Sequence, residues 1–97
     1  MEIKENKMAI TKTTTADKIE TLENGIVQVR TATIIKEDGK ELTRTYHRHI
    51  LEPSTKTGDT WGNTDISGEE TRVQAICNAV WTNAVKTAYQ EAQDAAE

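Results

Sequence analysis

The chain has 97 residues, a formal net charge of −4, 35% hydrophobic residues, 4% aromatic residues and no Phe. This length suits one small domain, and the low apolar content predicts a thin core that a partner or a second copy would complete. A single cysteine excludes an intrachain disulfide and favours a reducing compartment. The chain shows no apolar run long enough for a membrane helix and no signal peptide. We therefore expect a soluble protein that is made in a cytoplasm and has no membrane partner.

The charges are unevenly distributed along the chain. Residues 1–51 contain nine Lys and Arg against eight Asp and Glu, whereas residues 52–97 contain three against eight. Phosphate binding needs clustered Lys and Arg, so this acidic half argues against a nucleic-acid partner. A solvated surface is its simplest interpretation.

The first half of the chain is expected to form the sheet of a single domain spanning residues 1–97. Residues 1–8 are polar and lack periodicity, which predicts a flexible extension. In the sheet segment, residues 9–51, the threonine-rich run Thr11–Thr15 is typical of an edge strand. Asn24-Gly25 and Asp38-Gly39 each favour a two-residue type I′ turn. Together they predict three antiparallel strands.

The Asp38-Gly39 turn also predicts which side chains share a face. A two-residue loop puts the pairs Ile35–Leu42, Thr31–Tyr46 and Val27–Ile50 on one face, and the pairs Gln28–His49, Arg30–His47, Ala32–Thr45 and Ile34–Thr43 on the other. The first face is the more apolar and is the expected core face, although Arg44 and Arg48 also lie on it. Across Asn24-Gly25 the register stays open, because a two-residue loop places Leu22 but not Ile19 on that face.

Residues 52–68 are expected to form a long polar loop, which contains the only proline and Trp61. Loops of this length in small domains are usually functional or disordered. We expect Trp61 to fold back as a lid on the sheet, and contact with a partner is the alternative.

Residues 69–95 are expected to be helical. Ser67 to Glu70 fits a capping box with Ser67 as the N-cap. Apolar residues then recur three or four positions apart, at Val73, Ile76, Cys77, Val80, Ala84, Ala88 and Ala92. Thr82-Asn83 are poor helix formers and good caps, so one helix and a helix pair both remain open.

These elements predict an α+β fold, a three-stranded antiparallel β-meander packed by a C-terminal helix or helix pair. The expected core joins residues of the sheet to residues of the helix: Val27, Val29, Ile35, Leu42, Tyr46 and Ile50 against Val73, Ile76, Cys77 and Val80.

No constellation in the sequence predicts chemistry. His47 and His49 have a spacing that can chelate a metal, but no local third ligand accompanies them, so we predict no metal site. Cys77 lies in the apolar stripe, where burial makes a thiol inert. The sequence also lacks a glycine-rich phosphate loop and a nucleophile elbow. We therefore expect a protein that is not an enzyme and has no cofactor.

A protein-interaction surface is the remaining expectation. Its candidate residues are Trp61, Trp81, Val85, Tyr89, Arg30, His47 and His49. A thin core beside exposed strand edges also predicts self-association, most simply a homodimer that uses the Thr11–Thr15 edge and the helix residues Trp81, Val85 and Tyr89.

Several segments resemble small uncharacterised proteins encoded by tailed bacteriophages, including phages of aquatic bacteria. The segments are 8–12, 17–20, 29–33, 37–39, 47–49 and 73–77, and the likeness covers most of residues 8–92. The resemblance implies a phage origin, near genes for particle assembly, and supplies no site residues. We expect a small structural or assembly component of the virion that contacts phage structural proteins or itself. It would be made in the host cytoplasm and then enter the virion. The alternative is a soluble phage accessory protein that binds a host factor through its acidic helical half.

Overall fold

The computed structural model describes residues 9–96, so the extension expected over residues 1–8 lies outside it. The elements are β1 (Ile10–Thr21), β2 (Val27–Glu37), β3 (Lys40–Leu51), β4 (Ser54–Thr57), β5 (Thr60–Asn63), α1 (Thr71–Val80) and α2 (Asn83–Ala96). The first three strands form an antiparallel sheet in the order β1-β2-β3, and β4 pairs with β5 in a separate hairpin. The predicted α+β fold with a three-stranded meander is confirmed. The segment 52–68, expected to be a loop, contains the second hairpin.

The two turns of the meander differ in type. Asp38 and Gly39 have φ angles of 53° and 84°, as a type I′ turn requires, which confirms that prediction. The type I′ turn expected at Asn24-Gly25 is wrong, because only Gly25 has a positive φ there. The amide of Gly25 donates to the Leu22 carbonyl at 2.9 Å, and Leu22 pairs with Ile26. This is a three-residue loop, which needs left-handed backbone only at its last residue.

A β-bulge at Leu42 reverses the predicted faces of β3. Lys36 pairs with Glu41 but Ile35 pairs with Thr43, so Leu42 is an extra residue. A one-residue shift moves every following side chain to the other face. The face turned away from α1, here called the open face, therefore carries Lys18, Gln28, Arg30, Arg44, Tyr46, Arg48 and Ile50.

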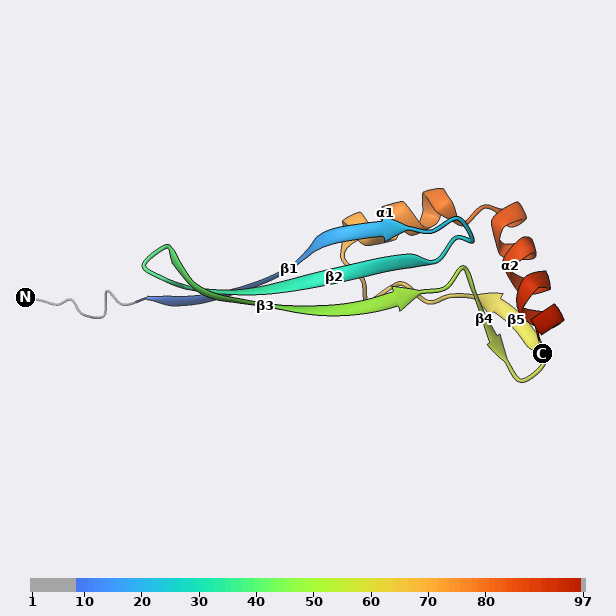
Figure 1. Ribbon diagram of the computed structural model, residues 1–97, viewed down its shortest axis with the longest axis horizontal. Coiled ribbons are helices and arrows are strands. Elements are labelled where there is room, and N and C mark those ends of the chain that lie inside the picture. Colours follow the sequence, from blue (N-terminus) through green and yellow to red (C-terminus); the bar gives the residue numbers. More distant parts are fainter. Residues whose placement is uncertain (1–8, 97) are drawn as a thin grey trace, which may run out of the picture.

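The core lies at the end of the sheet that α1 covers (Figure 1). Its buried members are Ala16, Val27, Val29, Leu51, Val73, Cys77 and Trp81. Leu42, Tyr46 and Ile50 were expected in the core and are exposed instead. The bulge turns Ile50 away from α1, whereas Leu42 and Tyr46 lie in a part of β3, residues 40–48, in which every residue is exposed. Ile35 and Ile76 are only half-buried.

The helical segment is a pair of helices. α1 ends at Val80, and the Thr82 hydroxyl accepts a hydrogen bond from the Val85 amide at 3.2 Å, so Thr82 caps α2. At the other end the expected capping box is absent, because Glu70 is the N-cap and makes no side-chain cap. Its carboxylate instead accepts from the backbone amide of Ala16 at 2.7 Å.

α2 packs against the β4–β5 hairpin through Tyr89. The Trp61 and Tyr89 rings meet edge to face at 6.1 Å, and the Tyr89 hydroxyl donates to Glu52 at 2.8 Å. Trp61 therefore packs on α2, and the lid expected over the three-stranded sheet is wrong. The residues Ala84, Ala88 and Ala92, expected in the apolar stripe, are exposed because the chain turns at Thr82 before α2 begins.

Candidate protein interface

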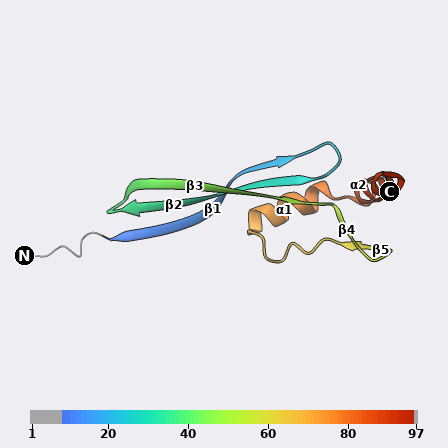
Figure 2. The ribbon, with the colours of Figure 1, turned by 60° about the horizontal axis from the view of Figure 1, so that its bottom comes forward.

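Half of the three-stranded sheet projects beyond the helices as an arm. The arm comprises Ile10–Thr15, Ala32–Glu37 and Lys40–Tyr46, and Figures 1 and 2 show it extending away from α1 and α2. Its strands reach about 20 Å, given the rise of about 3.3 Å per residue. No helix covers either face of the arm within the part of the chain that the structure describes. A sheet of this kind normally buries at least one face.

Large apolar side chains are exposed on the sheet. Ile10 is 58% exposed, Leu42 54%, Ile50 54% and Tyr46 47%. Single exposed apolar residues are ordinary, but a bare sheet that carries several of them is typical of a contact surface. Ile10 and Leu42 were not among the predicted interface residues. The bulge at Leu42 leaves no signature in the sequence.

The outer edge of β1 is blocked at one end and open along the arm. The backbone N–H and C=O groups of Ala16 point away from β2. The N–H donates to the Glu70 carboxylate, and the C=O accepts from the Arg72 guanidinium. Ala9, seven positions earlier, bonds inward to Asp38. The backbone N–H and C=O groups of successive residues point alternately toward β2 and away from it. Those that point away, here called outward, belong to Ile10, Lys12, Thr14 and Ala16. Of these four residues, Ala16 alone has hydrogen-bond partners for its outward backbone groups within residues 9–96.

A second bulge reinforces the block beside Ala16. The register between β1 and β2 shifts between Ala16 and Lys18, so Asp17 is an extra residue. Its carboxylate accepts two hydrogen bonds from Arg30, at 3.0 and 2.7 Å. The hydrogen bond and the charge of Arg30 lower the pKa of Asp17. Bulges of this kind stop an edge strand from pairing further.

The open face combines cations with an aromatic ring. The Arg30 guanidinium lies 4.2 Å from the centre of the Tyr46 ring, which leaves one ring face for another contact. Arg44 makes two hydrogen bonds to Glu41, and these raise the pKa of Arg44. Lys18 lies 3.9 Å from Glu20. Most positive charge on this face is therefore already paired, which weakens it as a phosphate site.

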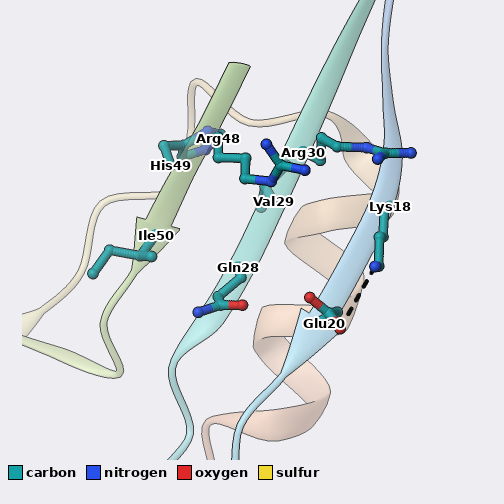
Figure 3. Close-up of a pocket in the computed structure, with 8 residues that line it drawn as sticks. All are labelled: Lys18, Glu20, Gln28, Val29, Arg30, Arg48, His49 and Ile50. Atoms are coloured by element: carbon teal, nitrogen blue, oxygen red, sulfur yellow. Dashed lines mark ion pairs between the residues drawn. The ribbon is translucent and has the colours of Figure 1, made fainter. Parts of the chain in front are cut away.

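A shallow depression of about 170 Å³ lies beside Arg30 and Arg48 (Figure 3). Lys18, Glu20 and Gln28 form its other side, and Ile50 lies at its end. Arg48 makes no ion pair within residues 9–96. The site is small and holds both charge signs, so it suits a side chain of a protein partner better than a cofactor.

The two histidines lie on the face of α1, opposite to the prediction. His47 pairs with Thr31 and His49 with Val29, and the imidazole rings stack at 6.2 Å. His49 Nε2 lies 3.0 Å from a Glu69 carboxylate oxygen. Across residues 9–96 no group of three or more His, Cys, Asp and Glu side chains could hold a metal. The predicted absence of a metal site stays a prediction, and a zinc titration followed by the thermal midpoint would test it.

The predicted helical interface residues are mostly internal. Trp81 is 7% exposed and its indole donates to the Gly25 carbonyl at 2.7 Å, while Tyr89 is 4% exposed. Val85 is half-buried against Gly25. Of the seven predicted residues, His47 is exposed, whereas Arg30, His49, Trp61 and Val85 are half-buried. Arg30 and His47 lie on opposite faces of the sheet.

Comparisons with known proteins leave the family open. No family model matches the sequence, and no curated protein and no solved structure is significantly similar to it. None of the helices in the described residues is long and apolar enough to cross a membrane.

Proposed function

We propose that this protein is a non-enzymatic structural or assembly component of a tailed-bacteriophage particle. It acts by laying its arm against other protein chains after synthesis in the host cytoplasm. The arm carries this proposal, because it exposes Ile10, Leu42 and Tyr46 on a part of the sheet that none of the helices within residues 9–96 covers. The phage context rests on the resemblance of residues 8–92 to small phage proteins.

The two ends of the molecule have different structural roles. The helical end holds the buried core and positions the sheet, and the arm contributes little to that core. Exposed apolar side chains on a segment outside the core are typical of a contact surface. An arm of about 20 Å is long enough to reach across a neighbouring small domain.

Mass spectrometry of purified particles of the encoding phage tests the proposal. Stoichiometric copies of the chain support a particle component. Absence from particles, with a host protein recovered on the tagged chain from infected cells, supports the accessory alternative and contradicts the proposal.

A matched pair of leucine variants tests the arm itself. Leu42→Ser changes the arm, whereas Leu22→Ser changes a comparably exposed leucine in the turn at the other end of the sheet. Leu42→Ser should reduce incorporation into particles by about 10-fold, because burying one such side chain contributes about 1.5 kcal/mol or more. Leu22→Ser should leave incorporation unchanged. Equal incorporation of both variants would remove the arm from the interface.

A further inference from the structure

The open edge of β1 points to a specific partner. Ile10, Lys12 and Thr14 direct backbone N–H and C=O groups away from β2, and within residues 9–96 no chain segment bonds them. An unpaired edge of this kind is a template for another strand. We propose that the segment Ile10–Thr15 pairs antiparallel with the same segment of a second copy, joining two sheets into one. This rests on the strand edge and holds whether or not the chain enters a particle.

The chain limits the length of any strand that can bind there. The side chains of Glu70 and Arg72 already hydrogen-bond to the backbone N–H and C=O groups of Ala16, and the bulge at Asp17 is the next residue. A bound strand therefore has to end where Ala16 begins. The same edge of a second copy has this length, because its own block lies at the same position.

The composition of the edge suits a copy of itself. Thr11 and Thr13 lie on one face, and with Lys12 on the two-fold axis Thr11 of each copy faces Thr13 of the other, a favourable cross-strand combination. Lys12 is the single charged residue of the segment. The other outer edge, β3, carries the four charged residues Lys40, Glu41, Arg44 and Arg48, and charged side chains on an edge strand discourage pairing, so the segment with one charge is the better candidate.

One register uses the whole open edge. With Lys12 on the two-fold axis, Ile10 of each copy faces Thr14 of the other, and every open outward residue has an open partner. A shift that places Lys12 opposite Thr14 brings Ile10 against Ala16, whose backbone groups are occupied. The favoured register therefore places the two Lys12 side chains next to each other at the axis, in solvent.

The arrangement leaves room for both helical ends. In Figure 2 the helices gather at the end of the molecule opposite to the arm. Antiparallel pairing of two arms places these helical ends at opposite ends of the joined sheet. A symmetric contact of this kind closes on itself as a dimer, and further copies do not add to that edge.

Sedimentation and a proline variant test the pairing. Thr14→Pro removes an outward N–H that makes no bond within the sheet, and proline is tolerated at such edge positions. We expect the wild-type chain to dimerise between about 1 and about 200 µM, in the affinity range of a small contact. Thr14→Pro should weaken the dimer at least about 10-fold, whereas Thr14→Ala, which keeps the N–H, should stay within about threefold. Circular dichroism should show the same strand content in all three chains.

A charge variant tests the register independently of folding defects. In a mixture of isotopically labelled wild type and Lys12→Glu, opposite charges meet at the axis only in the mixed dimer. Native mass spectrometry should find mixed dimers well above the roughly half expected from random pairing, and added salt should reduce the excess.

Three results would each overturn the proposal. They are a wild-type chain that stays monomeric over the whole range, Thr14→Pro dimers as tight as the wild type, and a statistical mixture with Lys12→Glu. None of them bears on whether the chain is a particle component, which the particle composition decides separately.

Discussion

Replacing Gly25 with alanine should destabilise the fold through two separable effects. Gly25 has a φ of 94°, and left-handed backbone costs a residue with a Cβ about 1–2 kcal/mol. A Cβ at this position would also lie 2.5 Å from Val85 Cγ1 and 2.9 Å from Pro53 Cγ. Forcing an extra methyl into packed surroundings costs about 1–3 kcal/mol more. The expected loss in the free energy of unfolding is therefore about 2–5 kcal/mol.

Gly39 provides the matched control. It has a φ of 84°, and no atom lies within 4 Å of a Cβ built there. Gly39→Ala should therefore lose only the backbone part, about 1–2 kcal/mol. Urea unfolding measures both losses at one fixed protein concentration, with tryptophan fluorescence as the signal, because the buried Trp81 indole becomes exposed on unfolding.

Removing the clashing neighbour should restore part of the lost stability. In the double variant Gly25→Ala with Val85→Ala, the new methyl enters space that the valine vacated. A double-mutant cycle should give a favourable coupling of about 1 kcal/mol or more. Equal losses for Gly25→Ala and Gly39→Ala, or a coupling near zero, would refute the close packing of the turn against α2.

Three further outcomes follow from burial and charge. Burial and the nearby Glu52 raise the pKa of Tyr89 to about 12, so its contribution to stability should be full below about pH 10 and lost as the pH rises from there to about 12. Tyr89→Phe should flatten that alkaline decline, and an unchanged decline would contradict the assignment. Burial raises the pKa of the Cys77 thiol, so a thiol reagent should react with it only on unfolding; reaction at the rate of a free thiol would place it at the surface. In urea unfolding, Val73→Ala should lower the free energy of unfolding by about 2 kcal/mol and Leu42→Ala by less than about 0.5 kcal/mol. The reverse order would place Leu42 rather than Val73 in the core.

The sequence was sufficient for the elements whose signals are local. Asp38-Gly39 predicted a tight turn because two consecutive left-handed residues favour this dipeptide. Thr82-Asn83 marked the place where the helix could break, because a threonine hydroxyl can serve as a cap, but the sequence left one helix and a helix pair both open. Both features depend on a few neighbouring residues.

The faces of β3 and the start of α1 could not be predicted in this way. One extra residue at Leu42 turns Tyr46 and Ile50 to the face opposite to the predicted one, and no local pattern distinguishes a bulged strand from a regular one. Glu70 resembles a capping residue, but its carboxylate bonds the amide of Ala16, which is 54 positions away. The candidate interface depends on both features, so only the Thr11–Thr15 edge was anticipated.

The block at Ala16 also has a consequence for the order of synthesis. Glu70 and Arg72 follow Ala16 by 54 and 56 positions, so the ribosome completes all three strands of the meander well before either side chain exists. The hairpins form from local contacts within microseconds, whereas translation takes seconds to reach α1. During that interval the whole of β1 is an open edge. Neighbouring nascent chains on one messenger would meet in this state, and we expect longer, out-of-register pairings to be removed only when α1 docks.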